Sequence, residues 1–170
     1  MNATSGANVP QVEQLKSAFL RLSLGRRVAL VSAVLGLLST FLHWYGVSVD
    51  EPPFSYSAAI NGWHGWGYLA ILGYVVAGAL SLLSGSGSMV RGLIPTLLPA
   101  ATDARIVMGS GAIAALATIL FMLTEGSGGT VPGISEGPSF GAYLGLLCAL
   151  ASVTGGFLLD REQHQAAPLS

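Results

Sequence analysis

Two histidines, His43 and His64, have the greatest potential for ligand chemistry in this chain. A neutral imidazole binds haem iron or a divalent metal ion, and its pKa near neutrality also suits proton transfer. His43 stands in the stretch Phe-Leu-His-Trp-Tyr-Gly-Val, which closes a long apolar run, and His64 stands just before the next apolar run. The two histidines therefore fall at neighbouring ends of two apolar segments. A haem- or metal-binding redox subunit is one function that this pair allows.

The sequence pattern does not supply the rest of such a site. No spacing fixes a third or fourth ligand, and the single cysteine, Cys148, lies inside an apolar run. One cysteine makes neither an intrachain disulfide nor a cysteine-based metal cluster. A histidine beside Trp44 and Tyr45 also suits a membrane surface, where an amphipathic ring keeps one side apolar and one nitrogen wet. We therefore predict no cofactor and no metal site, with His43 and His64 as the candidates should a cofactor bind.

The composition of the chain indicates the kind of protein that holds these histidines. Of 170 residues, 52% are hydrophobic and only 9% are charged, whereas a soluble domain carries about 25% charged residues. Too few charges are present to cover a surface that faces water. The net charge is −1 and no basic run occurs, so nucleic acid is not an expected partner.

Four segments reach the length of about 20 mostly apolar residues that a spanning helix needs. None of the four contains Asp, Glu, Lys or Arg, and they cover residues 28–47, 66–83, 106–123 and 140–159. The sequence therefore predicts an all-α membrane protein, a four-transmembrane-helix bundle with an N-terminal amphipathic helix. The predicted divisions are a cytoplasmic N-terminal segment, the transmembrane domain and a cytoplasmic tail, at residues 1–27, 28–159 and 160–170.

The distribution of charge predicts how the segments are oriented. All seven basic residues fall on one side of the predicted spans: Lys16, Arg21, Arg26, Arg27, Arg91, Arg105 and Arg161. The charged residues on the other side are all acidic: Asp50, Glu51, Glu125 and Glu136. Because cytoplasmic loops are enriched in Lys and Arg, we expect a multi-pass protein of the plasma membrane with both termini in the cytoplasm.

Aromatic residues gather at the opposite, outer boundary of the spans. All three tryptophans lie there, and we predict five membrane-interface anchors: His43, Trp44, Tyr45, Trp63 and Trp66. Such amphipathic rings are enriched at the level of the lipid headgroups.

The N-terminal segment has helical periodicity. Val12, Leu15, Phe19 and Leu22 recur at the spacing of one helix face, and basic residues surround them. Such a helix is attracted to the anionic inner leaflet. Packing beneath the bundle or against a partner subunit is the equally open alternative.

Small residues mark where the predicted spans pack. Helices in lipid associate through close backbone contact, so glycine and alanine four residues apart indicate interfaces. Each span has such a pair, and the predicted packing glycines are Gly36, Gly73, Gly111, Gly141 and Gly145.

The stretch around His43 resembles a group of small four-span membrane proteins of actinobacteria. Many of those carry Phe-Leu-Pro-Trp-Tyr at the end of the first span. Phe41, Leu42, Trp44 and Tyr45 match this pattern, while His43 stands where it has proline. The resemblance implies the four-span fold and membrane residence, and it assigns no function.

Several classes of chemistry are missing from the sequence. The spans hold no ionisable carboxylate or basic group of the kind that pumps and ion-coupled transporters use. No phosphate-binding loop, metalloprotease helix or nucleophile elbow occurs, so no catalytic residues are predicted and an enzyme is not expected. We expect an accessory or structural membrane protein that acts through helix–helix contacts with a partner complex or with itself. The alternatives are an oligomeric pore, a carrier or a lipid-binding protein, besides the redox subunit above.

Overall fold

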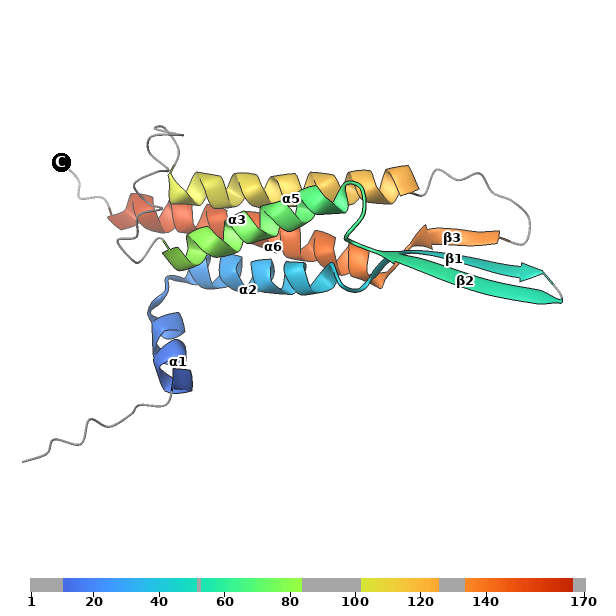
Figure 1. Ribbon diagram of the computed structural model, residues 1–170. Helices are drawn as coiled ribbons and strands as arrows, with labels where there is room; N and C mark the ends of the chain where they lie inside the picture. Colours follow the sequence, from blue (N-terminus) through green and yellow to red (C-terminus); the bar gives the residue numbers. More distant parts are fainter. Residues whose placement is uncertain (1–10, 52, 84–101, 126–133, 167–170) are drawn as a thin grey trace, which may run out of the picture.

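The structure is a computed structural model that describes residues 11–51, 53–83, 102–125 and 134–166. Four helices lie side by side and form the helix bundle: α2 (Leu24–Ser39), α3 (Gly67–Leu83), α5 (Asp103–Glu125) and α6 (Phe140–Ala166). A three-stranded sheet projects from one end of this bundle, and the short helix α1 (Gln11–Arg21) lies at the other end (Figure 1). The strands are β1 (His43–Glu51), β2 (Phe54–Asn61) and β3 (Ile134–Pro138).

The four helices contact one another in a ring. Helix α2 packs against α3 and α6, and α5 packs against the same two helices. Gly73 lies where α3 meets α5, because a Cβ there would stand 2.6 Å from the carbonyl oxygen of Ser110. Gly111 lies against α6 in the same way, 2.9 Å from the main-chain nitrogen of Val153. The bundle therefore depends on backbones that approach more closely than side chains would allow.

Small side chains fill the interior of the bundle, and large apolar side chains cover its outside. The buried residues of α5 are mostly glycine, alanine, serine and threonine: Ala104, Val107, Ser110, Gly111, Ala114, Ala115, Ala117, Thr118 and Phe121. Its exposed residues include Ile113, Leu116, Ile119, Leu120 and Leu123. The other three helices follow the same rule, with exposed Leu38, Leu72, Val75, Leu82, Leu147, Leu150 and Phe157. Water-soluble proteins have the opposite distribution.

The buried serine and threonine residues of the four helices make hydrogen bonds inside the bundle. Ser110 and Thr118 donate to carbonyl oxygens one turn earlier in α5, at 2.9 and 2.8 Å. Ser32 of α2 and Ser152 of α6 also share a hydrogen bond of 2.9 Å between helices. A buried polar group without a partner costs free energy, so these bonds allow serine and threonine to serve as small packing residues.

Two helices, α5 and α6, are long and apolar enough to cross a membrane. They contain the predicted spans 106–123 and 140–159. Helix α3 is apolar but has 17 residues, and it nearly coincides with the predicted span 66–83.

The predicted first span is wrong in its second half, and the prediction of an all-α protein is wrong with it. Helix α2 covers only part of 28–47, because it ends at Ser39 and the chain becomes a strand at His43. Three successive i→i+3 hydrogen bonds tighten the chain after Leu37. The indole N–H of Trp44 then donates to the carbonyl oxygen of Ser39. In a continuing helix, a main-chain N–H would donate to this oxygen instead.

Strands β1 and β2 both contain β-branched and aromatic residues. Such residues favour strands. The strand order of the sheet is β2-β1-β3, with both pairs antiparallel. The pairing of β1 with β2 runs from His43 opposite Asn61 to Glu51 opposite Phe54, with an irregularity between His43 and Tyr45. Strand β3 brings the segment just before α6 to the other side of β1, so the sheet joins two parts of the chain that are far apart in sequence.

Helices are present in both predicted terminal segments. Helix α6 continues to Ala166, so residues 160–166 of the predicted tail extend the last helix. In the N-terminal segment, α1 provides the predicted helix, and residues 1–10 lie outside the described part. The guanidinium of Arg27 donates to the carbonyl oxygens of Leu20 and Leu22 and lies over the ring of Phe19, which ties α1 to the start of α2.

Two glycines of α5 allow the effect of close packing on stability to be distinguished from the effect of helix propensity. A Cβ at Gly111 would meet Val153, Ser152 and Ala149 of α6 at 2.9–3.1 Å, whereas a Cβ at Gly109 would meet nothing within 4 Å. We expect Gly109→Ala to raise the free energy of unfolding by up to about 1 kcal/mol, because alanine is the better helix former. Gly111→Ala should instead lower it by about 1–3 kcal/mol through overpacking. Thermal unfolding in detergent measures both variants, and equal shifts would contradict the assigned interface.

Candidate functional site: the junction of helices and sheet

Trp44 is the central residue of the junction between the bundle and the sheet. Its side chain is completely buried, and its indole Nε1–H donates to the Ser39 carbonyl oxygen at 2.8 Å. The ring meets Phe121 of α5 edge to face, with centroids 5.2 Å apart, a favourable arrangement for two aromatic rings. One side chain at the start of β1 thus contacts the end of α2 and the last turns of α5.

Three glycines make room for this indole. A Cβ at Gly62, just after β2, would lie 2.8 Å from an atom of the Trp44 ring. At Gly141 and Gly145, in the first turns of α6, the corresponding distances are 2.8 and 3.0 Å. The main-chain carbonyl of Trp44 also accepts the N–H of Ser139 at 2.8 Å, just before α6 begins. The predicted packing glycines of the fourth span therefore surround a side chain rather than only another helix.

Tyr74 of α3 is a second buried aromatic residue that packs against glycine. Its ring is fully buried beside Gly36 of α2, and its hydroxyl donates to the carbonyl oxygen of Gly145 at 2.6 Å. A tyrosine inside an apolar run is the signal that could have predicted this bond, because a buried phenol needs a partner. With Gly73 and Gly111, all five predicted packing glycines lie in buried contacts.

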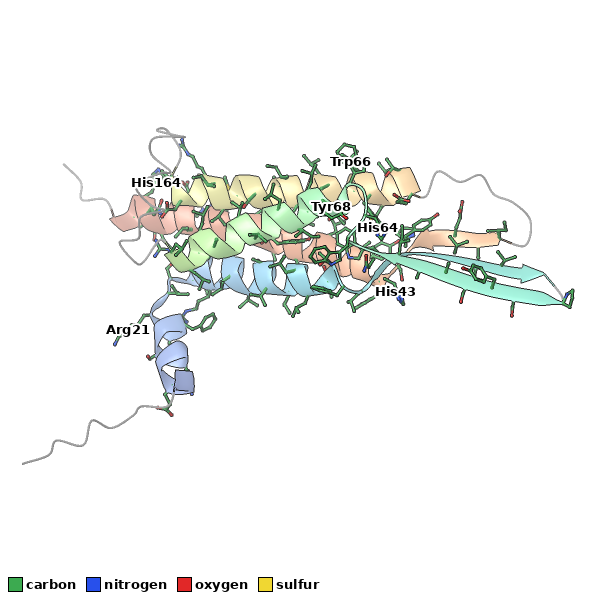
Figure 2. The ribbon with its side chains drawn as sticks, viewed as in Figure 1. Arg21, His43, His64, Trp66, Tyr68 and His164 are labelled. Atoms are coloured by element: carbon green, nitrogen blue, oxygen red, sulfur yellow. The ribbon has the colours of Figure 1, made fainter. Side chains whose placement is uncertain are left out.

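The predicted anchors separate into two groups. Trp63 and Trp66 are exposed around the turn that leads into α3, and His43 is exposed beside the sheet (Figure 2). Trp44 and Tyr45 are buried, so their prediction as membrane-interface anchors is wrong. The reason is that the helix has ended before His43: at the start of β1 the Trp44 ring enters the space between the end of α2, α5 and the glycines of α6.

The two histidines both lie near the junction of the bundle and the sheet. His43 and His64 are exposed on different segments of the junction (Figure 2). Among the described residues, no group of three or more His, Cys, Asp or Glu side chains is placed to hold a metal ion. His164 lies at the other end of the bundle, where its ring approaches Asp160.

Tyr45 is the buried group with unusual electrostatics in this region. Its hydroxyl is buried and makes no hydrogen bond with the described residues. Burial raises the pKa of this phenol, and the nearby carboxylates of Glu136 and Glu125 raise it further. Tyr45 is therefore a buried phenol beside two acidic residues at the sheet end of the bundle.

One face of the sheet is small and polar. Ser48 of β1 pairs with Ser57 of β2 and with Ser135 of β3, and directly opposed residues of antiparallel strands share a face. A depression of about 610 Å³ lies over this row and is also lined by His43 and Ser139. The surface offers hydroxyl and imidazole groups for hydrogen bonds, without a nucleophile–base arrangement that would indicate catalysis.

The other face of the sheet is apolar toward its tip. Val49 pairs with Tyr56 and Ile134, and these two outer side chains are exposed, Tyr56 by 69%. Because β1 is the central strand, β2 and β3 form the two edges of the described sheet. The sheet therefore presents two strand edges and an exposed apolar tip.

No protein-family model matches this chain, and no curated protein matches it.

The role of Trp44 can be tested against a tryptophan of the same region. Trp44→Phe removes the hydrogen bond to Ser39 and leaves a cavity, and we expect it to lower the free energy of unfolding by about 2 kcal/mol or more. Trp63→Phe, at an exposed tryptophan, should change it by less than about 0.5 kcal/mol. Similar shifts in the thermal unfolding of the two variants would show that the junction does not depend on Trp44.

Proposed function

We propose that this protein is an integral protein of the plasma membrane whose four bundle helices cross the bilayer and display the sheet outside the cell. The observation that carries the proposal is the reversed packing of the bundle. Large apolar residues face outward along all four helices, and small residues face inward. Lipid tails solvate such an exterior, and close backbone contact then holds the helices together.

The distribution of charge supports an orientation. The described basic residues lie at the end of the bundle opposite the sheet: Lys16, Arg21, Arg26, Arg27, Arg105 and Arg161. Glu125 and Glu136 lie at the sheet end. By the positive-inside rule, α1 and the end of α6 would be cytoplasmic and the sheet would lie outside.

The lengths of the helices are compatible with spanning, with some adjustment by the bilayer. At 1.5 Å per residue, α2 and α3 extend about 24–26 Å, slightly less than the hydrocarbon core of about 30 Å. Exposed Phe41 and Leu42 continue the apolar surface beyond α2, and Trp66 does so before α3. Lipids accommodate the small remaining mismatch by local thinning.

The role that suits this geometry is that of an accessory protein that works by contact with a partner. The predicted packing glycines lie in contacts inside the bundle, so we place the partner contact at the sheet, with its polar face, apolar tip and two edges. Closely packed small residues occupy the bundle interior together with the buried rings of Tyr74 and Phe121, so a pore would have to form between copies. The resemblance to small four-span membrane proteins is consistent with this role.

The orientation predicts which positions are accessible from outside. In a background with Cys148→Ala, cysteines at Ser55 and Ser135, both exposed on the sheet, should react with an impermeant thiol reagent on intact cells. A cysteine at Thr102, at the opposite end, should react only after lysis. The reverse pattern would overturn the orientation, and release of the protein by alkaline carbonate would overturn membrane insertion.

The site of partner contact can be tested with a photoreactive phenylalanine analogue. Placed at Tyr56 on the sheet, it should give a cross-linked product of discrete mass in native membranes. At Leu116, which is exposed on α5, it should react with lipid only. A protein adduct at Leu116 alone would favour helix–helix contact, an adduct of twice the chain's mass would indicate self-association, and no adduct at either position would count against an accessory role.

A further inference from the structure

An apolar groove runs along the outer seam between α3 and α5. Its volume is about 340 Å³. Leu72, Val76 and Ile113 are among its apolar lining residues, and Gly109 and Ser110 leave it open. The hydroxyl proton of Ser110 is already donated to the Val107 carbonyl oxygen at 2.9 Å. The groove therefore suits a hydrocarbon chain rather than a polar ligand.

Among the described residues, one arginine lines this groove, and it stands at one end. Arg105 lines it from the first turn of α5, and its side chain is exposed and forms no ion pair with the described residues. The N-terminus of a helix favours a nearby negative charge. The carboxylate of Asp103, in the same turn of α5, provides part of that charge. One anionic group beside Arg105 would meet the guanidinium at the point where the hydrocarbon groove begins.

We infer that the α3/α5 groove binds one acyl chain of an anionic phospholipid, with the lipid phosphate at Arg105. The inference rests on the proposed membrane location and names a ligand within it. From Arg105 to Ile113 the groove extends about 12 Å at 1.5 Å per residue, close to the half-thickness of about 15 Å of the hydrocarbon core. The occupant is therefore a lipid of the leaflet on the basic side, the cytoplasmic one in the proposed orientation.

A second groove in the same molecule provides an internal comparison. It lies between α2 and α6, has a volume of about 440 Å³, and also ends at an arginine, Arg27. The guanidinium of Arg27, however, already donates to the carbonyl oxygens of Leu20 and Leu22. This groove can hold a hydrocarbon chain, but its arginine is occupied by α1. Preference for an anionic headgroup should therefore depend on Arg105.

The test is native mass spectrometry of the full chain, delipidated in detergent and supplied with phosphatidylglycerol or phosphatidylcholine of identical acyl chains. One basic residue near a membrane surface contributes enough for a preference of about fivefold for the anionic lipid. We expect Arg105→Gln to abolish this preference. Arg161→Gln, at the same end of the bundle but outside the groove, and Arg27→Gln should retain it.

The hydrocarbon part of the site has its own matched pair of variants. Gly109→Leu fills the groove without a clash, because a Cβ at Gly109 meets nothing within 4 Å, and it should reduce binding of both lipids severalfold. Ala112→Leu places the same side chain at an exposed position of α5 outside the groove and should leave binding unchanged.

Equal behaviour of Arg105→Gln and Arg161→Gln, or unchanged binding in Gly109→Leu, would overturn the inference. Should Gly109→Leu not fold, the arginine variants alone decide. Failure of the membrane proposal itself is a separate observation, namely release of the protein by alkaline carbonate.

Discussion

The burial of one tryptophan at the end of the bundle is the constraint on which the rest of the structure depends. Trp44 donates its indole proton to the last residue of α2, packs against Phe121 of α5, and fits between glycines before α3 and in α6. These contacts lie where α2 ends, where the chain enters β1, and where α6 begins. The sheet is therefore held rigidly on the bundle, because its first strand and the helix ends share one packed side chain.

The bundle itself reflects a choice of solvent. Because small residues line the inside of the bundle, burial of apolar area contributes little to helix association. Close backbone contact holds the helices together, as do hydrogen bonds such as the one from the Tyr74 hydroxyl to the Gly145 carbonyl oxygen. The large apolar side chains on the outside would be unfavourable in water but suit lipid. The same closeness leaves shallow seams between helices, and those seams give a lipid chain a defined place to lie.

The two ends of the molecule are chemically different, and this difference organises the proposed function. The sheet end presents hydroxyl groups, exposed aromatic residues and the carboxylates of Glu125 and Glu136, which lie near the buried phenol of Tyr45. The opposite end collects the described arginines, of which Arg27 is bound to α1 and Arg105 is available to an anion. One end suits contact with a protein, and the other suits contact with anionic headgroups.

The sequence by itself determined the apolar helical segments and the one-sided distribution of basic residues, and it pointed to the glycines that later proved to be buried. These properties depend on composition and on spacing along one helix, which are local. Only the tertiary structure decided that residues 43–51 form a strand and that Trp44 and Tyr45 are buried. An apolar run that ends in β-branched and aromatic residues satisfies a helix and a strand equally well. The choice was made by partners distant in sequence, because β3 pairs with β1 from nearly 90 residues later and the glycines of α6 provide the space that the Trp44 ring occupies.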